Sequence, residues 1–193
     1  MKKLIVATSN PGKLEEMQSY LAELDCELAL KPPEIEVEET GTSFRENAQL
    51  KARTVAQATG NYAIADDSGL AVNALNGAPG IYSARYANTD EERIARLLKE
   101  LGDTPHRSAK FICAVAIARP DGSIALDKER SCKGEILRAP QGNNGFGYDP
   151  IFYFPAVQKT FAEMDPLLKQ KVSHRGLAFS ALFPEIQQIL QEE

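Results

Sequence analysis

Residues 4–24, LIVATSNPGKLEEMQSYLAEL, place an apolar run, a polar loop and a helical pattern in direct succession. The run from Leu4 to Ala7 is short and wholly apolar, which predicts a buried strand. The segment from Thr8 to Gly12 contains Asn, Pro and Gly and predicts a loop. Apolar side chains then recur at helical spacing, at Leu14, Met17, Leu21 and Leu24. The stretch therefore predicts a strand, a loop and a helix.

The middle of the chain continues this alternation. Residues 27–30 and 35–37 are weaker strand candidates. Ser43 with Glu46 and Thr89 with Glu92 have the spacing of capping boxes, which predicts a helix start at each. We expect the first of these helices to end at Gly60. Residues 62–65 predict a buried strand that ends in the polar run 66–69, and residues 70–88 predict loops.

The last third predicts a hairpin and a helix. Residues 111–118 and 124–132 flank Pro120-Asp121-Gly122-Ser123, the clearest hairpin signal in the chain. A helix is expected from about Arg175, with Pro184 kinking or breaking it. No repeat or linker interrupts the sequence. We therefore expect residues 1–193 to form a single domain of the α/β class, built on a mixed sheet.

Composition removes several classes of protein. A net charge of −5 disfavours nucleic acid as a partner. No apolar run approaches the roughly 20 residues of a membrane span, and the N-terminal run is too short for a secretory signal. The three cysteines are an odd number without close pairs, which disfavours a disulfide framework. A reducing, cytoplasmic setting is expected.

Two polar segments have residue types suited to phosphate and metal. Residues 8–13, TSNPGK, open a predicted helix, where backbone N–H groups favour an anion. The spacing is not that of a Walker loop, and a helix cap with a solvated lysine explains the segment equally well. Glu36, Glu38 and Glu39, with Asp66 and Asp67, offer the oxygen ligands that magnesium prefers. A solvated acidic loop is the alternative for the glutamates.

Two later segments could recognise a base. Residues 142–149, GNNGFGYD, combine glycines that allow close backbone approach with two aromatic rings, Phe146 and Tyr148. A tight turn with aromatics in the core is the alternative. Residues 173–176, SHRG, follow Lys169 and Lys171 and form a donor cluster for an anion or a carbonyl. His174 could also be purely structural.

Six motifs together resemble a known family. The segments TSNPGK, EETG, ADDSGL, GAPGIYSARY, GFGYDPIF and SHRG occur in the order of the inosine triphosphate pyrophosphatase, or Ham1-like, family. The resemblance covers residues 4–179. It implies an elongated fold of two lobes around a long mixed sheet, with flanking helices and the active site in the cleft between the lobes. It also implies a homodimer.

The resemblance also implies residue roles. Asp67 is the catalytic residue and, with Glu38, a ligand of Mg2+; Glu39 is the near alternative to Glu38. Substrate-binding roles fall to the phosphate loop, to residues after it and to the base segment: Thr8, Ser9, Asn10, Pro11, Gly12, Lys13, Lys51, Ser68, Phe146, Gly147, Tyr148, Asp149, Lys169, His174 and Arg175.

The activity implied is hydrolysis of ITP, dITP and XTP to the nucleoside monophosphate and pyrophosphate, which removes damaged purines from the nucleotide pool. A donor from Arg175, His174 or the backbone, facing the 6-keto oxygen, would exclude ATP. One rival is a pyrophosphatase for modified pyrimidine or dUTP-like substrates. Another is a nucleotide-binding module without catalysis, which has no need of a base beside a metal.

Overall fold

The computed structural model describes residues 2–191, which divide into two compact units. Unit 1 is made of the residues up to Asp67, of Cys113–Arg130 and of the residues from Arg175 onward. Unit 2 is made of Ser68–Ile112 and Ser131–His174. The expectation of one domain over residues 1–193 stays a prediction.

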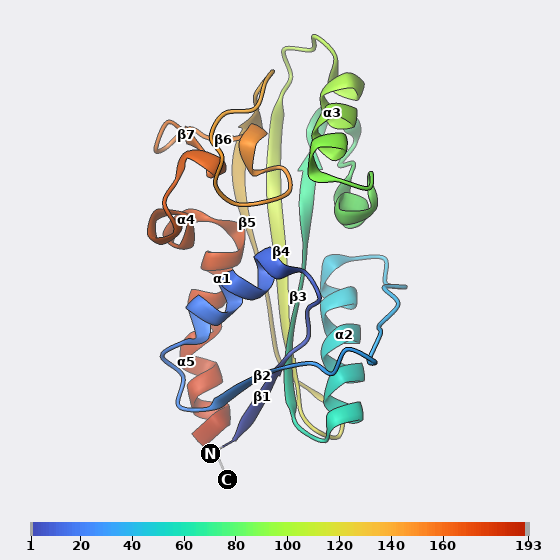
Figure 1. Ribbon diagram of the computed structural model, residues 1–193, viewed down its shortest axis with the longest axis vertical. Helices are drawn as coiled ribbons and strands as arrows, with labels where there is room; N and C mark the ends of the chain where they lie inside the picture. Colours follow the sequence, from blue (N-terminus) through green and yellow to red (C-terminus); the bar gives the residue numbers. More distant parts are fainter. Residues whose placement is uncertain (1, 192–193) are drawn as a thin grey trace. The chain divides into compact units, whose positions relative to one another are not determined.

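The secondary structure is that of a mixed α/β protein (Figure 1). The helices are α1 (Pro11–Leu21), α2 (Phe44–Thr59), α3 (Asp90–Leu101), α4 (Pro166–Val172) and α5 (His174–Gln191). The strands are β1 (Lys3–Val6), β2 (Glu27–Leu30), β3 (Tyr62–Val72), β4 (Ser108–Ala118), β5 (Ile124–Ile136), β6 (Phe152–Phe154) and β7 (Lys159–Thr160). Short 3-10 helices cover Asn73–Leu75, Gly80–Arg85, Asp149–Ile151 and Phe161–Glu163.

The strands form one sheet in the order β2-β1-β3-β4-β5-β6-β7. Strand β1 pairs in parallel with β2 and β3, whereas β6 pairs antiparallel with β5 and β7. Parallel neighbours need a crossover connection, and helices α1 and α2 supply it after β1 and β2. The α/β class with a mixed sheet is therefore confirmed.

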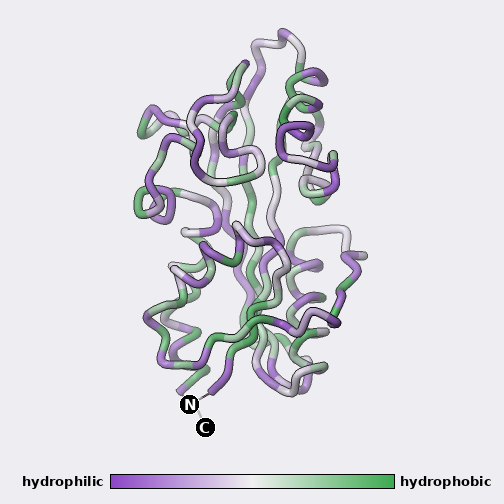
Figure 2. The backbone as a smooth tube through the Cα atoms, viewed as in Figure 1, coloured by the Kyte–Doolittle hydropathy of each residue, from purple (hydrophilic) through white to green (hydrophobic). Residues whose placement is uncertain are grey.

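Unit 1 has its own hydrophobic core. Helices α1 and α5 lie on one side of the strands of this unit and α2 lies on the other (Figure 1). The core on the α1 and α5 side includes Met17, Ile64, Val115 and Phe179, none more than 2% exposed. The hydropathy pattern explains why this core forms. In Figure 2, β1 is almost continuously hydrophobic, while α1 and α2 alternate between polar and apolar residues.

Unit 2 has a second core that is rich in aromatic residues. The rings of Phe111 and Phe152 lie 4.6 Å apart, and those of Phe152 and Phe161 lie 4.8 Å apart, both tilted. Helix α3 adds Ile94, Leu97 and Leu101 to this cluster. Tilted rings at such distances gain more than their buried area alone provides.

The predicted helix starts are confirmed. The Ser43 side chain caps α2 by accepting from the backbone N–H of Glu46, and Gly60 ends the helix with a left-handed φ of 65°. Thr89 and Glu92 form a complete capping box at the start of α3. The hairpin turn around residues 120–123 joins β4 to β5, as expected.

Three expectations about elements are wrong. Strand β3 does not end at residue 65 but continues through the polar run to Val72, which also removes residues 70–72 from the predicted loops. Residues 35–37 are not a strand. Of the kink or break expected at Pro184, the break is wrong, since helix α5 continues to Gln191. The buried Leu182 and Ile186 on either side of the proline hold the helix against the core.

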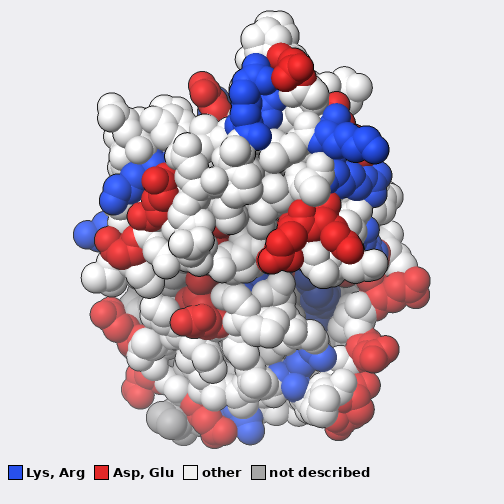
Figure 3. All heavy atoms as spheres, turned by 45° about the horizontal axis from the view of Figure 1, so that its top comes forward, with Lys and Arg blue, Asp and Glu red and all other residues white. Residues whose placement is uncertain are grey.

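The surface carries both signs of charge. In the view of Figure 3, acidic and basic side chains are interspersed and separated by uncharged atoms. Within residues 2–191, no helix combines the length and apolarity needed to cross a bilayer.

Replacing Pro184 by alanine should stabilise the protein. Pro184 is exposed and lies inside α5, where it lacks the N–H that would bond one turn back. We expect Pro184→Ala to raise the free energy of unfolding by up to about 3 kcal/mol, measured by urea titration. Gln187→Ala, an exposed change in the same helix, is the control and should have little effect. A less stable Pro184→Ala variant would show that the ring makes a needed contact.

Candidate functional site

Asp66 lies at the centre of the polar part of unit 1. Its carboxylate is 1% exposed, on β3. The Oδ2 atom lies 3.2 Å from Lys13 Nζ of α1. It also accepts from Arg175 of α5, 3.2 Å from Nε and 3.1 Å from Nη2. A buried carboxylate needs such compensation, because transfer of an isolated charge from water is very costly.

These contacts keep Asp66 in its charged form. Burial of Asp66 would raise its pKa, but Lys13, Arg175 and Lys51 outweigh it and hold the pKa of that carboxyl well below its usual range. Glu16 adds a second carboxylate, 2.5 Å from Arg175 Nη1. The guanidinium of Arg175 is therefore held between two carboxylates while only 2% exposed.

The loop before α1 fixes Lys13. The Asn10 side chain caps the helix by accepting from the backbone N–H of Lys13 at 3.0 Å, and Thr8 Oγ1 accepts from the Asn10 N–H at 3.2 Å. Pro11 begins the helix, where its missing N–H costs nothing. The segment is therefore a helix cap, and its lysine forms an ion pair with the buried Asp66. The solvated lysine that was the alternative from the sequence is not observed.

Asp67 occupies a different environment on the same strand. It is 5% exposed, and its Oδ2 accepts from Asn47 Nδ2 at 3.1 Å. Its Oδ1 lies 3.6 Å from Lys51 Nζ, and the same Nζ lies 2.6 Å from Glu39 Oε1. Asn47 and Lys51 are one turn apart on α2, so both point to the same strand.

Asn47 is a site residue that the sequence reasoning missed. It is fully buried, and its Oδ1 also accepts from the backbone N–H of Gly41 at 2.8 Å. The signal available in the sequence was its position four residues before Lys51 on the same helical face. Through these two bonds Asn47 connects the segment 38–41 to Asp67.

Asp66 and Asp67 have opposite pKa shifts. Burial raises the pKa of the Asp67 carboxyl, and the charges of Lys51 and Lys13 offset only part of that. Burial would lower the pKa of Lys51, but Asp67, Asp66 and Glu39 together raise it. Lys51 thus remains a cation between two carboxylates.

The residues of unit 1 suit a hard divalent cation brought by a substrate. Within residues 2–191, no group of three acidic, histidine or cysteine side chains is close enough to hold a metal alone. Magnesium often needs only one or two carboxylates plus substrate phosphates. Asp66 Oδ1 is buried and has no hydrogen-bond partner in the described part of the chain. Glu39 reaches the cluster through Lys51, while its neighbour Glu38 is exposed.

The segment 145–149 of unit 2 is fixed by its own carboxylate. Asp149 Oδ2 accepts from the Phe146 N–H at 3.0 Å and lies 2.6 Å from Lys169 Nζ. A side chain at Gly145 would begin 2.1 Å from that oxygen, so only glycine permits the approach. Lys169 Nζ also lies 4.9 Å from the centre of the Phe146 ring.

The two aromatic rings of this segment differ. Phe146 is half-buried. Tyr148 is 4% exposed in the core of unit 2, and its hydroxyl donates to the Ser83 carbonyl at 2.9 Å. Of the two rings proposed from sequence as a wall for a base, Phe146 is therefore the accessible one.

The segment 173–176 contributes to both units. His174 is 4% exposed, and its ring stacks on Phe111 with a centroid distance of 4.6 Å and an interplanar angle of 9°. Ser173 is fully buried, whereas Ser9 is exposed and Ser68 is half-buried. In unit 1 the structure brings Lys13, Lys51, Asp66, Asp67 and Arg175 together; in unit 2 it brings together Phe146, Asp149 and Lys169.

Taken together, the fold and these residues define a mixed α/β protein in which lysines and carboxylates form one buried charged cluster in unit 1. A family model described as the Ham1 family matches residues 4–185. The chain belongs to the Ham1 family, as the motifs of the sequence indicated.

Individual relatives agree along almost the whole chain. The dITP/XTP pyrophosphatase of a Nostoc species is 67% identical over 189 residues, which cover 98% of this chain and 96% of that protein. The dITP/XTP pyrophosphatase of a Synechocystis species is 64% identical over 182 residues, 94% of each chain. The structure of a HAM1 protein from Coxiella burnetii is similar, with a TM-score of 0.87 and 44% identity, and covers 97% of this chain and 100% of that one.

Removing the charge of Asp66 should destabilise the protein. Asp66→Asn leaves Lys13 and Arg175 buried with less compensation, and breaking such a buried pair costs about 3–5 kcal/mol of folding free energy. The measurement is urea unfolding at neutral pH. Asp127→Asn is the control, because Asp127 is partly exposed and pairs with Arg45 at 3.7 Å. A loss below about 1 kcal/mol for Asp66→Asn, as expected of a surface pair, would contradict the claim that this buried ion pair stabilises the fold.

Proposed function

We propose that this protein hydrolyses non-canonical purine nucleoside triphosphates, namely ITP, dITP and XTP, to the nucleoside monophosphate and pyrophosphate. The observation that carries the proposal is the buried Asp67, held by Asn47 and Lys51. Relatives at 67% and 64% identity that are named dITP/XTP pyrophosphatases support the substrate class.

The triphosphate binds, in this proposal, to the polar cluster of unit 1. It carries about four negative charges, and clamps on such charge are commonly the largest catalytic contribution. Lys13 and Lys51 supply cations, and the loop formed by Thr8, Ser9, Asn10, Pro11 and Gly12 supplies hydroxyl, amide and backbone donors at a helix start. Ser68, next to Asp67, adds a hydroxyl.

We assign the divalent cation, proposed to be Mg2+, to Asp67 and Glu38. Glu39 already forms an ion pair with Lys51, so its exposed neighbour Glu38 is the carboxylate we assign to the metal, with Glu39 as the alternative. When bound, such a cation neutralises phosphate charge and polarises the phosphoryl oxygens.

Asp67 is the proposed general base. Its carboxylate takes a proton from the water that cleaves the anhydride bond between the α- and β-phosphates. Burial raises the pKa of the Asp67 carboxyl, which makes it a stronger base, and the positive charge of Lys51, 3.6 Å away, offsets part of that rise. Asn47 orients the second oxygen, so the carboxylate is already placed before water arrives.

The base is recognised, in this proposal, by the residues of segment 146–149 together with Lys169, His174 and Arg175. Phe146 supplies an apolar face for stacking, and Gly147, Tyr148 and Asp149 shape the segment around it. A donor facing the 6-keto oxygen of inosine or xanthosine would meet the amino group of adenine in ATP, and opposed donors are costly. Arg175 suits this task because Asp66 and Glu16 fix its orientation.

The cellular setting follows from chemistry and resemblance. Cys26, Cys113 and Cys132 are free thiols, which supports a reducing, cytoplasmic location. The resemblance supports a homodimer and a role in removing damaged purines before polymerases use them.

A panel of triphosphates tests the function. With Mg2+ we expect kcat/KM for ITP, dITP and XTP to exceed that for ATP by at least about 100-fold, with equal amounts of monophosphate and pyrophosphate released. EDTA should abolish turnover. Preference for a pyrimidine or dUTP-like substrate would favour the rival enzyme, and binding without pyrophosphate release would favour a nucleotide-binding module.

The role of Asp67 has its own test. Asp67→Asn removes the base but keeps an oxygen that can accept from Asn47, so the fold should be retained. We expect kcat for ITP to fall by about 10²–10⁴-fold, measured as pyrophosphate release, with an unchanged circular dichroism spectrum. Asp127→Asn is the matched control and should remain active. Turnover of Asp67→Asn within a few-fold of the unmodified protein would rule out this base.

A further inference from the structure

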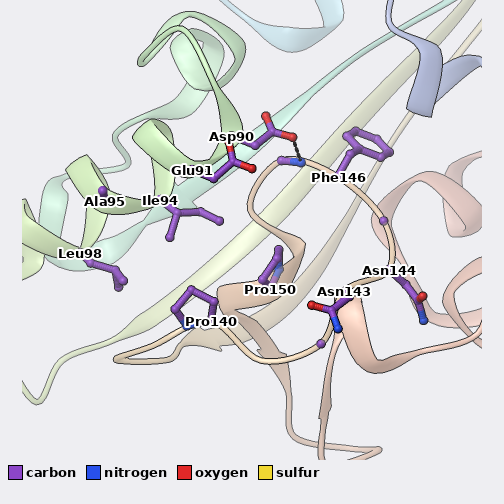
Figure 4. Close-up of a pocket in the computed structure, with 13 residues that line it drawn as sticks. Asp90, Glu91, Ile94, Ala95, Leu98, Pro140, Asn143, Asn144, Phe146 and Pro150 are labelled. Carbon is purple, nitrogen blue, oxygen red and sulfur yellow. Dashed lines mark hydrogen bonds between the residues drawn. The ribbon is translucent and has the colours of Figure 1, made fainter.

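Asp90 lies outside the segment 146–149, which we propose recognises the base, but it contacts that segment. It is the first residue of α3, and its Oδ2 accepts from the backbone N–H of Gly147 at 2.6 Å, across 57 residues of sequence (Figure 4). The usual N–H···O distance is near 2.9–3.0 Å, and a carboxylate acceptor shortens and strengthens such a bond. The contact is therefore a specific one.

The Asp90 carboxylate is itself fixed. Its Oδ1 lies 2.5 Å from Arg93 Nη1, and Arg93 Nε donates to the Ala87 carbonyl at 3.0 Å. Arg93 thus ties the carboxylate to the segment before α3. An aspartate in the first turn also suits the helix dipole, but the dipole alone does not require an oxygen directed at Gly147.

Two carboxylates hold two successive amides of the base segment. Asp149 accepts from the Phe146 N–H and Asp90 accepts from the Gly147 N–H, so donors on both sides of the Phe146 carbonyl group are fixed. Gly147 has a φ of +61°, a conformation that most residues avoid. This backbone fixes the direction in which the Phe146 side chain leaves the main chain.

A cavity behind the segment makes the Asp90 bond more important. Its volume is about 540 Å³, and Ile94 and Leu98 of α3 face Pro140 and Pro150 across it (Figure 4). Residues 142–147 line the same cavity. The cavity leaves this side of the segment without close packing, so the hydrogen bonds from Asp90 and Asp149 contribute to its position.

We infer that Asp90 is a positioning residue for base recognition: through Gly147 it sets the place of Phe146, and it thereby contributes to the selectivity between 6-keto purines and ATP. The inference rests on the proposed function. The proposed base is a different residue, Asp67, so the loss of Asp90 should affect nucleotide affinity and selectivity much more than kcat.

The test compares Asp90→Ala, Asp90→Asn and Glu91→Ala. We expect Asp90→Ala to raise KM for ITP about tenfold and to lower the ITP-to-ATP ratio of kcat/KM about tenfold, the factor of one charge-assisted hydrogen bond. The kcat for ITP should change less than about threefold. Asp90→Asn keeps an amide oxygen that can accept from Gly147 and should restore most of the selectivity. Glu91→Ala, on the same cavity, should behave as the unmodified protein.

Equal losses for ITP and ATP in Asp90→Ala, with an unchanged ratio, would overturn the inference and leave Asp90 a purely structural role. Should Asp90→Ala not fold, Asp90→Ser keeps a helix-start residue that is too short to reach Gly147. The unmodified protein with ITP decides the proposed function separately. If it showed no turnover, calorimetric titration with ITP and ATP would measure the same ratio as affinities, and an Asp90→Ala ratio equal to that of the unmodified protein would refute the inference.

Discussion

The ion pairs and hydrogen bonds of the buried Asp66 hold the helices of unit 1 to its central strand. A carboxylate at 1% exposure in a strand is tolerated only because Lys13 and Arg175 approach the same oxygen. These cations come from α1 and α5, near opposite ends of the chain, so one buried charge ties both helices to β3. The same network places Lys13 where a phosphate could use it.

The two adjacent aspartates show how one strand can support two tasks. Asp66 is compensated by cations and its pKa is lowered, whereas burial raises the pKa of Asp67. Opposite shifts in neighbouring carboxyls agree with the proposal that Asp66 has a structural role and Asp67 is the base. Their side chains point to opposite faces of the sheet, because successive strand residues alternate. Asp66 therefore meets α1 and α5, and Asp67 meets Asn47 and Lys51 of α2.

Local chemistry made much of the fold predictable. The caps of Ser43 and Thr89 and the turn before Ile124 depend on residues within a few positions, and all three were found where the sequence placed them. The course of β3 was not predictable locally, because the cations that allow Asp66 to be buried lie 53 and 109 residues away. Likewise, the sequence around Pro184 does not reveal the core residues against which Leu182 and Ile186 hold α5 in place.

The chemical groups of the site could be predicted from residue types, but the contacts that hold them could not. The motifs indicated Lys13 and Asp67, and the family resemblance indicated Lys51; these lie in one polar cluster of unit 1. They did not distinguish Phe146 from Tyr148, because that difference depends on a hydrogen bond to Ser83 and on core packing. Asn47 was missed because an amide inside a helix resembles ordinary surface composition until its partner is known. Selective catalysis needs groups fixed before the substrate arrives, and such fixing is done by long-range partners. A sequence therefore reveals the chemical groups of a site sooner than it reveals the residues that hold them.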